Sequence, residues 1–285
     1  AFNGGSKAVT GQAADYWQYH KVTVPQGALG WDIQVTSASG GVPKMVIRRD
    51  ELPETLHSTQ HIATQNVWES GRQWAADSDW TGRATNPDGS TVNYKRLTMG
   101  LGSPLTAGNY YVGVYNASNS GEMDYTLESR GIGIGNDGAG NPWSLQVEDL
   151  SFEGDVAGSG LAPREQAYYR VQVPESQAAW NLTLDPTAGH EAKLVVRKEA
   201  LGNVAASLTD SNGVYFYGTS RDTSGNENFA KFHTDASEFV DAGTYYVTVI
   251  SQGQNPASGK VGADPIDYVL SSTGTIPVED KTDTP

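Results

Sequence analysis

The chain contains the same ordered set of sequence patterns twice. Tyr19–Pro25 reads YHKVTVP, and 149 residues later Tyr168–Pro174 reads YYRVQVP. The same shift carries Trp31 onto Trp180. Three further matches keep this order: 45–49 with 194–198, 107–114 with 242–249, and 124–127 with 267–270. Two copies of roughly 130–140 residues have the length of ordinary domains, and they are far longer than solenoid repeats of about 20–50 residues.

Hydrophobic residues alternate with polar ones through most of these matched segments. In 31–35, Trp31, Ile33 and Val35 share one face, and 180–184 repeats the pattern. Alternation with a period of two is typical of half-buried antiparallel strands, and turn residues, including 33 glycines, separate the segments. We therefore predict an all-β fold of two tandem jelly-roll-like antiparallel β-sandwiches. The predicted parts are a first domain at 1–134 with an insertion at about 54–102, a Gly-rich connector at 135–144, a second domain at 145–276 and a tail at 277–285.

Composition excludes several classes of function. A formal net charge of −14 disfavours a nucleic-acid partner, which requires a cationic face. The absence of cysteine excludes disulfides and thiolate metal sites. No stretch approaches the roughly 20 apolar residues of a membrane span. We expect a secreted or cell-surface protein.

The second copy opens with a segment that has no counterpart in the first. Phe2-Asn3-Gly4 matches Phe152-Glu153-Gly154, so the strand predicted at 145–150 (LQVEDL) precedes the matched region. The tail segment 276–280 (IPVED) resembles 145–149 and is predicted to be an opening strand of the same kind. The chain is then either a piece of a longer tandem array or a subunit whose tail pairs head to tail with the first domain of another copy by β-augmentation.

The matched segments resemble the bacterial pre-peptidase C-terminal domain. The resemblance is carried by the Y-x-R/K-V-x-V-P strands, the L-V-V-R-K-type strands, the A-G-x-Y-Y-V-x-V strands and the closing strands with Tyr125 and Tyr268. Domains of this family are similar to the jelly-roll collagen-binding domains of clostridial collagenases. The resemblance implies a secreted, non-catalytic accessory domain that sometimes binds calcium, although the insertion at 54–102 departs from the family pattern.

No motif for catalysis is recognisable. There is no G-x-S-x-G nucleophile elbow, and none of the five histidines occurs at matched positions in the two copies, so we do not expect an enzyme. Calcium is the metal that the oxygen-rich segments favour, because it requires six to eight hard oxygen ligands. The candidate calcium ligands near the domain boundary are Asn136, Asp137, Asp149 and Asp155. The alternative is that these side chains belong to solvated loops.

The insertion contains three tryptophans spaced six residues apart, with polar residues between them. Indole faces stack on sugar rings, and neighbouring polar groups can bind hydroxyls. The candidate ligand-binding residues are Trp68, Trp74, Trp80, Arg72, Asp77 and Asp79. The alternative is that the tryptophans pack against the sandwich and anchor a long loop. The sequence thus predicts a binding or accessory protein that contacts polysaccharide or extracellular protein, and the alternative is a structural repeat of a surface adhesin or filament.

Overall fold

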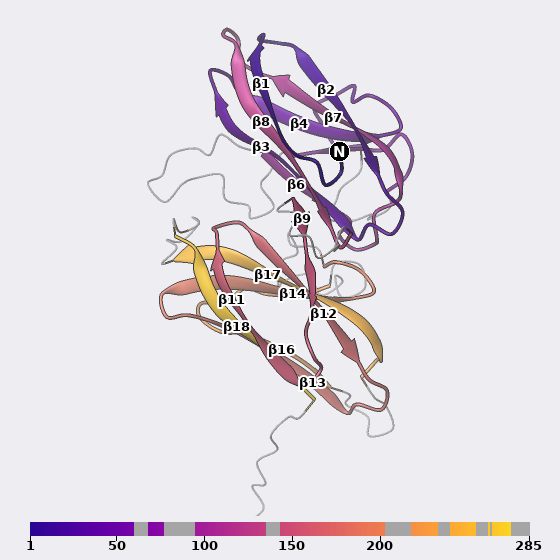
Figure 1. Ribbon diagram of the computed structural model, residues 1–285, viewed down its shortest axis with the longest axis vertical. Coiled ribbons are helices and arrows are strands. Elements are labelled where there is room, and N and C mark those ends of the chain that lie inside the picture. Colours follow the sequence, from indigo (N-terminus) through magenta and orange to yellow (C-terminus); the bar gives the residue numbers. More distant parts are fainter. Residues whose placement is uncertain are drawn as a thin grey trace, which may run out of the picture.

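The computed structural model describes residues 1–59, 68–76, 95–134, 143–202, 218–232, 240–254, 262 and 264–274. Within these residues every helix or strand is a β-strand, so the predicted all-β fold is confirmed. The strands form two sandwiches arranged end to end along the long axis of the molecule (Figure 1). We call them domain 1, which contains β1 to β8, and domain 2, which contains β10 to β18.

Domain 1 is a jelly roll of two four-stranded sheets. One sheet has the order β1-β8-β3-β6 and the other the order β2-β7-β4-β5. All these pairs are antiparallel. The strands are β1 (Gly5–Gln12), β2 (Trp17–Val24), β3 (Gly30–Ser39), β4 (Pro43–Arg49), β5 (Gln73–Ala75), β6 (Lys95–Met99), β7 (Gly108–Asn116) and β8 (Met123–Ile132).

Domain 2 repeats this topology strand by strand. Its sheets have the orders β11-β18-β13-β16 and β12-β17-β14-β15, and β10 is added beside β12. The bulge between Val9 and Gln12 in β1 recurs between Gly158 and Leu161 in β11, 149 residues later. The strands are β10 (Val147–Asp149), β11 (Gly154–Leu161), β12 (Gln166–Val173), β13 (Ala179–Pro186), β14 (His190–Lys198), β15 (Thr219–Arg221), β16 (Glu227–Phe232), β17 (Gly243–Gln254) and β18 (Ile266–Thr273).

The two cores are built around equivalent tryptophans, as the alternation predicts. Trp31 and Trp180 are each fully buried. Trp31 Nε1 donates to Ser129 Oγ at 2.8 Å, and Trp180 Nε1 donates to Ser272 Oγ at 2.9 Å. Each serine hydroxyl in turn donates to the carbonyl of a phenylalanine near the first strand, Phe2 in domain 1 and Phe152 in domain 2. The indole N–H is therefore satisfied in the same way in both cores.

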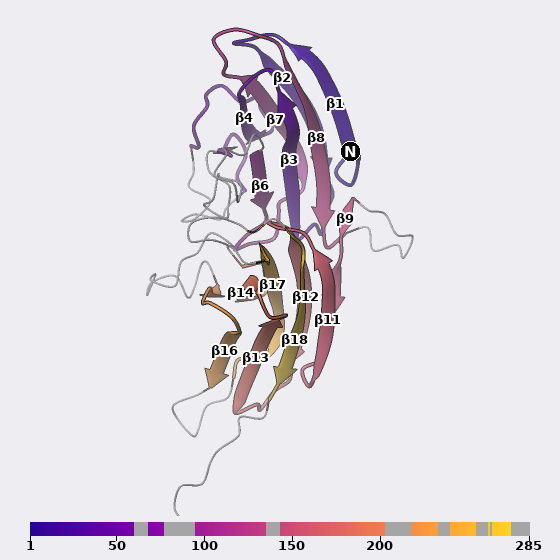
Figure 2. The ribbon, with the colours of Figure 1, turned by 90° about the vertical axis from the view of Figure 1, so that its left-hand side faces the viewer.

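The segment that joins the domains belongs to both of them. β9 (Ser144–Leu145) pairs in parallel with β8 of domain 1, and β10 pairs in parallel with β12 of domain 2. Figure 2 shows this segment running from one domain into the other. The connector predicted at 135–144 therefore ends in a strand, since Ser144 lies in β9. The opening strand predicted at 145–150 is divided between two sheets, which the pattern of one segment alone could not show.

Candidate functional site at the domain interface

An apolar cluster lies between the two domains, separate from either core. Leu101 and Ile132 of domain 1 are 2% and 0% exposed and pack with buried side chains of domain 2. The domain 2 members are Tyr168, Val195, Leu201, Tyr246 and Ile250. Leu101 and Leu201 also form an isolated parallel bridge, and the Gly102 N–H donates to the Leu201 carbonyl at 2.7 Å. This joint is thus packed and hydrogen-bonded like the inside of a domain.

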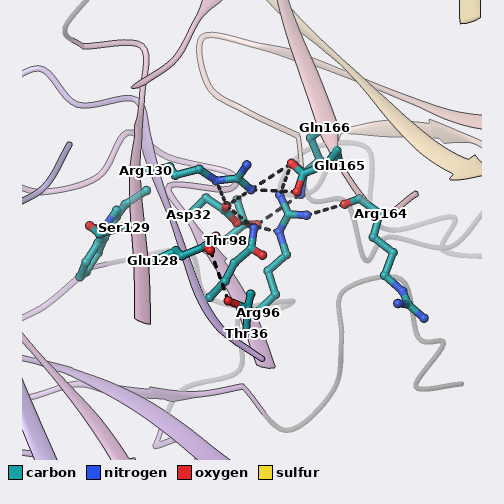
Figure 3. A network of polar contacts seen from close by, with 12 residues as sticks. Asp32, Thr36, Arg96, Thr98, Glu128, Ser129, Arg130, Arg164, Glu165 and Gln166 are labelled. Atoms are coloured by element: carbon teal, nitrogen blue, oxygen red, sulfur yellow. Dashed lines mark hydrogen bonds and ion pairs between the residues drawn. The ribbon is translucent and has the colours of Figure 1, made fainter. Parts of the chain in front are cut away.

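A buried network of charges lies beside this cluster and centres on Asp32. Asp32 is on β3 between its cross-strand neighbours Thr98 on β6 and Arg130 on β8, and it is 0% exposed. Its Oδ1 accepts from Arg96 Nε at 2.7 Å, and its Oδ2 accepts from Arg130 Nε at 2.9 Å. Thr98 Oγ1 also donates to the carboxylate (Figure 3). Gln34 Nε2 donates to it as well, at 2.9 Å. The carboxylate is therefore ionically paired and fully hydrogen-bonded, as a buried charge requires.

The pKa shifts follow from this geometry. Burial on its own would raise the pKa of Asp32, but the guanidinium groups of Arg96 and Arg130 and the hydrogen bond from Gln34 outweigh it, so the pKa is lowered. Burial would likewise lower the pKa of Arg96, but Asp32 and Glu165 raise it. Burial would also lower the pKa of Arg130, but the same two carboxylates raise it. Asp32, Arg96 and Arg130 therefore stay charged at neutral pH.

The network extends across the joint into domain 2. Arg130 Nη2 lies 2.9 Å from Glu165 Oε2, and Arg96 Nη2 lies 3.6 Å from the same oxygen. Arg96 also donates to the Arg164 carbonyl, as Figure 3 shows. Gln166 Nε2 donates to Thr98 Oγ1 at 3.3 Å. Two arginines of domain 1 are thus shared between carboxylates of both domains, and this geometry positions the domains relative to one another.

A comparison of the two copies could have pointed to this network, whereas the residues of one copy alone could not. The shift of 149 residues places Asp32 on Asn181, and the strand pairings place Arg130 on Thr273. Domain 2 thus has neutral residues where domain 1 has charges, on strands that otherwise match. Asp32 is a carboxylate that only the first copy has, between core residues that both copies share. This difference could have identified the joint.

The predicted tryptophan site is wrong for the two tryptophans that the structure describes. Trp68 is 2% exposed and Trp74 is 0% exposed, and their ring centroids lie 5.3 Å apart within the core of domain 1. Trp68 Nε1 donates to the Ser103 carbonyl at 3.0 Å. A long insertion needs apolar anchors, so packing explains both indoles and neither can stack on a sugar. Arg72 is exposed and pairs with Glu69, while Asp77, Asp79 and Trp80 lie outside the described residues.

The predicted calcium ligands are not brought together where the structure describes them. Asp149 forms a two-bond pair with Arg170, at 2.7 Å and 2.9 Å, at an exposed position on β10. Asp155 is exposed on β11, which belongs to the other sheet. Asn136 and Asp137 lie outside the described residues. Among the residues described, no group of three or more histidines, aspartates or glutamates is arranged to hold a metal.

Comparisons with known proteins identify no family for this chain. No family model matches the sequence, and no curated protein matches it. A protein from Eubacterium rectale described as secreted has 9% identity and a TM-score of 0.22, covering 90% of this chain and 68% of that one. The CUB1-EGF-CUB2 domain of human MASP-1/3 has 10% identity and a TM-score of 0.22, covering 94% and 99%. Tripeptidyl peptidase 2 has 11% identity and a TM-score of 0.23, covering 93% of this chain and 23% of that one. In the part of the chain that the structure describes, no helix has the length and apolar character of a membrane span.

Proposed function

We propose that this chain is a non-catalytic structural module of an extracellular protein, in which two jelly-roll domains act as one rigid unit. The observation that carries the proposal is the buried ion network in which Arg96 and Arg130 of domain 1 are shared by Asp32 and Glu165. Such a network is not expected between domains that move on a flexible linker. Its charges are removed from water only while the domains stay in contact, so they must be paired in one fixed arrangement. The extracellular setting rests on the resemblance to the pre-peptidase C-terminal domain.

Two further features support a rigid joint. The apolar cluster around Leu101 and Leu201 removes side chains of both domains from water. The segment β9–β10 ties the sheet of one domain to the sheet of the other by main-chain hydrogen bonds. The joint thus combines the three kinds of contact that fix positions inside a single domain.

Binding of a polysaccharide through the insertion is not part of this proposal. Binding of this kind requires exposed indoles, whereas Trp68 and Trp74 are buried. A structural role requires the aromatic residues of the insertion to stabilise the fold. The packing of Trp74 against Tyr110 and against Trp68 does so.

Calorimetry of the whole chain tests the proposal. A rigid unit unfolds in one transition whose van't Hoff enthalpy equals the calorimetric enthalpy for all 285 residues. The variant Glu165→Lys places a third cation beside Arg96 and Arg130 and should split this transition in two. Glu175→Lys makes the same charge change at an exposed position of domain 2 and should leave one transition. Two independent transitions in the unaltered chain would disprove the rigid unit.

A further inference from the structure

Arg48 of domain 1 and Arg197 of domain 2 occupy equivalent positions in the two copies. The shift of 149 residues matches one to the other. The turn after each arginine is also the same, because the residue two positions later has a positive φ, of 64° at Asp50 and 65° at Glu199. The main-chain N–H of that residue donates to a carbonyl of β7 or β17, at 2.8 Å and 2.9 Å. The surroundings of the two guanidinium groups can therefore be compared directly.

Arg48 obtains its acceptors from its own domain. Its Nε donates to the Gly71 carbonyl and its Nη1 to the Leu52 carbonyl, each at 3.1 Å. The carboxylates of Glu51 and Glu54 pair with the same guanidinium, Glu54 at 2.9 Å. A guanidinium at this position thus binds a peptide segment through two kinds of acceptor, carboxylates and main-chain carbonyls.

Domain 2 keeps the arginine but lacks the acceptors that follow it in domain 1. Ala200 stands in place of the first glutamate, and the sequence has Asn203 in place of the second. The Leu201 carbonyl, which matches the main-chain acceptor in the loop after β4, accepts from the Gly102 N–H across the joint at 2.7 Å. Two substitutions and the domain joint have therefore removed acceptors that domain 1 retains.

Arg197 is left with donors that the described part of the chain does not satisfy. Its Nε and Nη1 are buried and have no hydrogen-bond acceptor there. Burial lowers the pKa of Arg197, whereas carboxylates raise the pKa of the buried Arg96 and Arg130 of the joint. A buried donor without an acceptor is unfavourable, and more so on a charged group. An acceptor supplied from outside the chain removes this cost.

The arginine lies on the outer face of its sheet. Val195 faces the joint, and residues two apart in a strand share a face, so Arg197 lies on the same side as Val195. It is half-buried there and lies opposite Tyr246. Arg170, on the other side of Tyr246, is paired with Asp149. Arginine has a long side chain, so the guanidinium of Arg197 can turn toward a ligand on this face without a change in the main chain.

We propose that Arg197 is a binding site for a carboxylate of an acidic peptide segment from another protein. The segment supplies an acidic side chain and main-chain carbonyls, as residues 51–54 supply them to Arg48. The planar fork of a guanidinium matches a carboxylate with two parallel hydrogen bonds. This site goes beyond the proposed structural role, and its test does not measure the rigidity of the joint.

Nuclear magnetic resonance of the nitrogen-15-labelled full chain tests the site through the Nε–H signals of its arginines. The probe is a tetrapeptide with blocked ends and the sequence ELPE, which copies residues 51–54. We expect a saturable shift of the Arg197 signal, and at least tenfold weaker binding of the control peptide QLPQ. Arg197→Met should abolish binding of ELPE. Arg72→Met removes an exposed arginine of domain 1 and should leave the binding unchanged.

Thermal unfolding separates a binding site from a structural arginine. Arg48→Met removes a guanidinium that is paired within its domain and should lower the midpoint of unfolding. Arg197→Met removes buried donors that lack acceptors in the described part of the chain, and it should leave the midpoint unchanged or raise it. An equal decrease in both variants would show that Arg197 has a structural partner and would overturn the proposal.

Three results of the titration would also overturn the proposal. The first is an unchanged Arg197 signal in the presence of ELPE, and the second is equal binding of ELPE and QLPQ. The third is binding of trigalacturonate without binding of ELPE, which assigns the site to an acidic polysaccharide. None of these results changes the number of unfolding transitions, which tests the rigid two-domain unit. The failure of this site and the failure of the proposed function are therefore told apart.

Discussion

At the scale of single residues, Asp32 is the position where a conservative substitution should lower the stability most. Its carboxylate is the shared acceptor for Arg96, Arg130 and Gln34 in a site without solvent. Removing its charge leaves Glu165 as the one carboxylate paired with the two guanidinium groups among the described residues. The loss then includes the cost of the unpaired cations, beyond the value of the ion pair itself.

Asp32→Asn should lower the free energy of unfolding by about 3–5 kcal/mol, the usual cost of breaking a buried ion pair. Asp149→Asn removes the exposed partner of Arg170 and should cost about 1 kcal/mol or less. Urea unfolding at neutral pH measures both changes in the free energy of unfolding. Equal effects of the two variants would contradict a buried role for Asp32.

The same residue gives the stability a defined pH dependence. The pKa of Asp32 is lower in the folded than in the unfolded chain, so its contribution is present above the unfolded pKa of about 3.9. That contribution decreases as the pH falls through the folded pKa. The difference in free energy of unfolding between the unaltered chain and Asp32→Asn should therefore become smaller in acid. A difference that stays constant from neutral to acid pH would argue against this role of Asp32.

The serines that bind the core tryptophans provide a test of equivalence between the domains. Ser129→Ala and Ser272→Ala each remove the acceptor of a buried indole N–H and should each cost about 1–3 kcal/mol. The two costs, from denaturant unfolding, should agree because the hydrogen bonds have the same partners. A large cost in only one domain would show that the two cores are not equivalent.

At the scale of elements, the strands that occur in both copies could be predicted from the sequence, and the divided segment could not. Strands such as β3 and β13 alternate regularly around Trp31 and Trp180, so the side that each one buries follows from its own residues. The segment 144–149 pairs with two sheets, and its partners are chosen by the placement of whole domains. No local pattern contains that information.

The tryptophans of the insertion show a second limit of prediction from sequence. An indole spaced among polar residues looks the same in sequence whether it binds a ligand or anchors a loop. Burial decides the matter, and it depends on Tyr110 and other core residues distant in the chain.

Leu150 tests the role of the opening strand in domain 2. Leu150→Ala should cost about 2–5 kcal/mol, because it removes a buried side chain that closes one side of the sandwich. Val269→Ala, at a residue that is 40% exposed on β18, should change the stability by no more than about 0.5 kcal/mol. Thermal or denaturant unfolding gives both values, and a negligible effect at Leu150 would mean that the strand does not complete the core.

At the scale of the whole molecule, the joint determines how the chain responds to its surroundings. Surface ion pairs are screened by salt, with a Debye length of about 3 Å at 1 M, but buried pairs are screened much less. The ion pairs that cross between the domains join Arg96 and Arg130 to Glu165, and these three side chains are 1%, 13% and 27% exposed. The attraction between the domains should thus be nearly independent of ionic strength.

We therefore expect the single unfolding transition of the chain to persist from 50 mM to 1 M sodium chloride. The measurement is the ratio of van't Hoff to calorimetric enthalpy in each solution, which stays near one for a single cooperative unit. Separation into two transitions at high salt would show that exposed charges hold the domains together.

The division of the segment 144–149 between two sheets also affects how proteases can act on the protein. Endopeptidases bind their substrates as extended strands whose main-chain groups are free, and exposed unpaired loops are the usual places of cleavage. Here the main chain of Ser144–Leu145 and of Val147–Asp149 is already engaged by β8 and β12. Cleavage within these residues requires the sheets to open first, so β9 and β10 are protected from proteases while both domains stay folded.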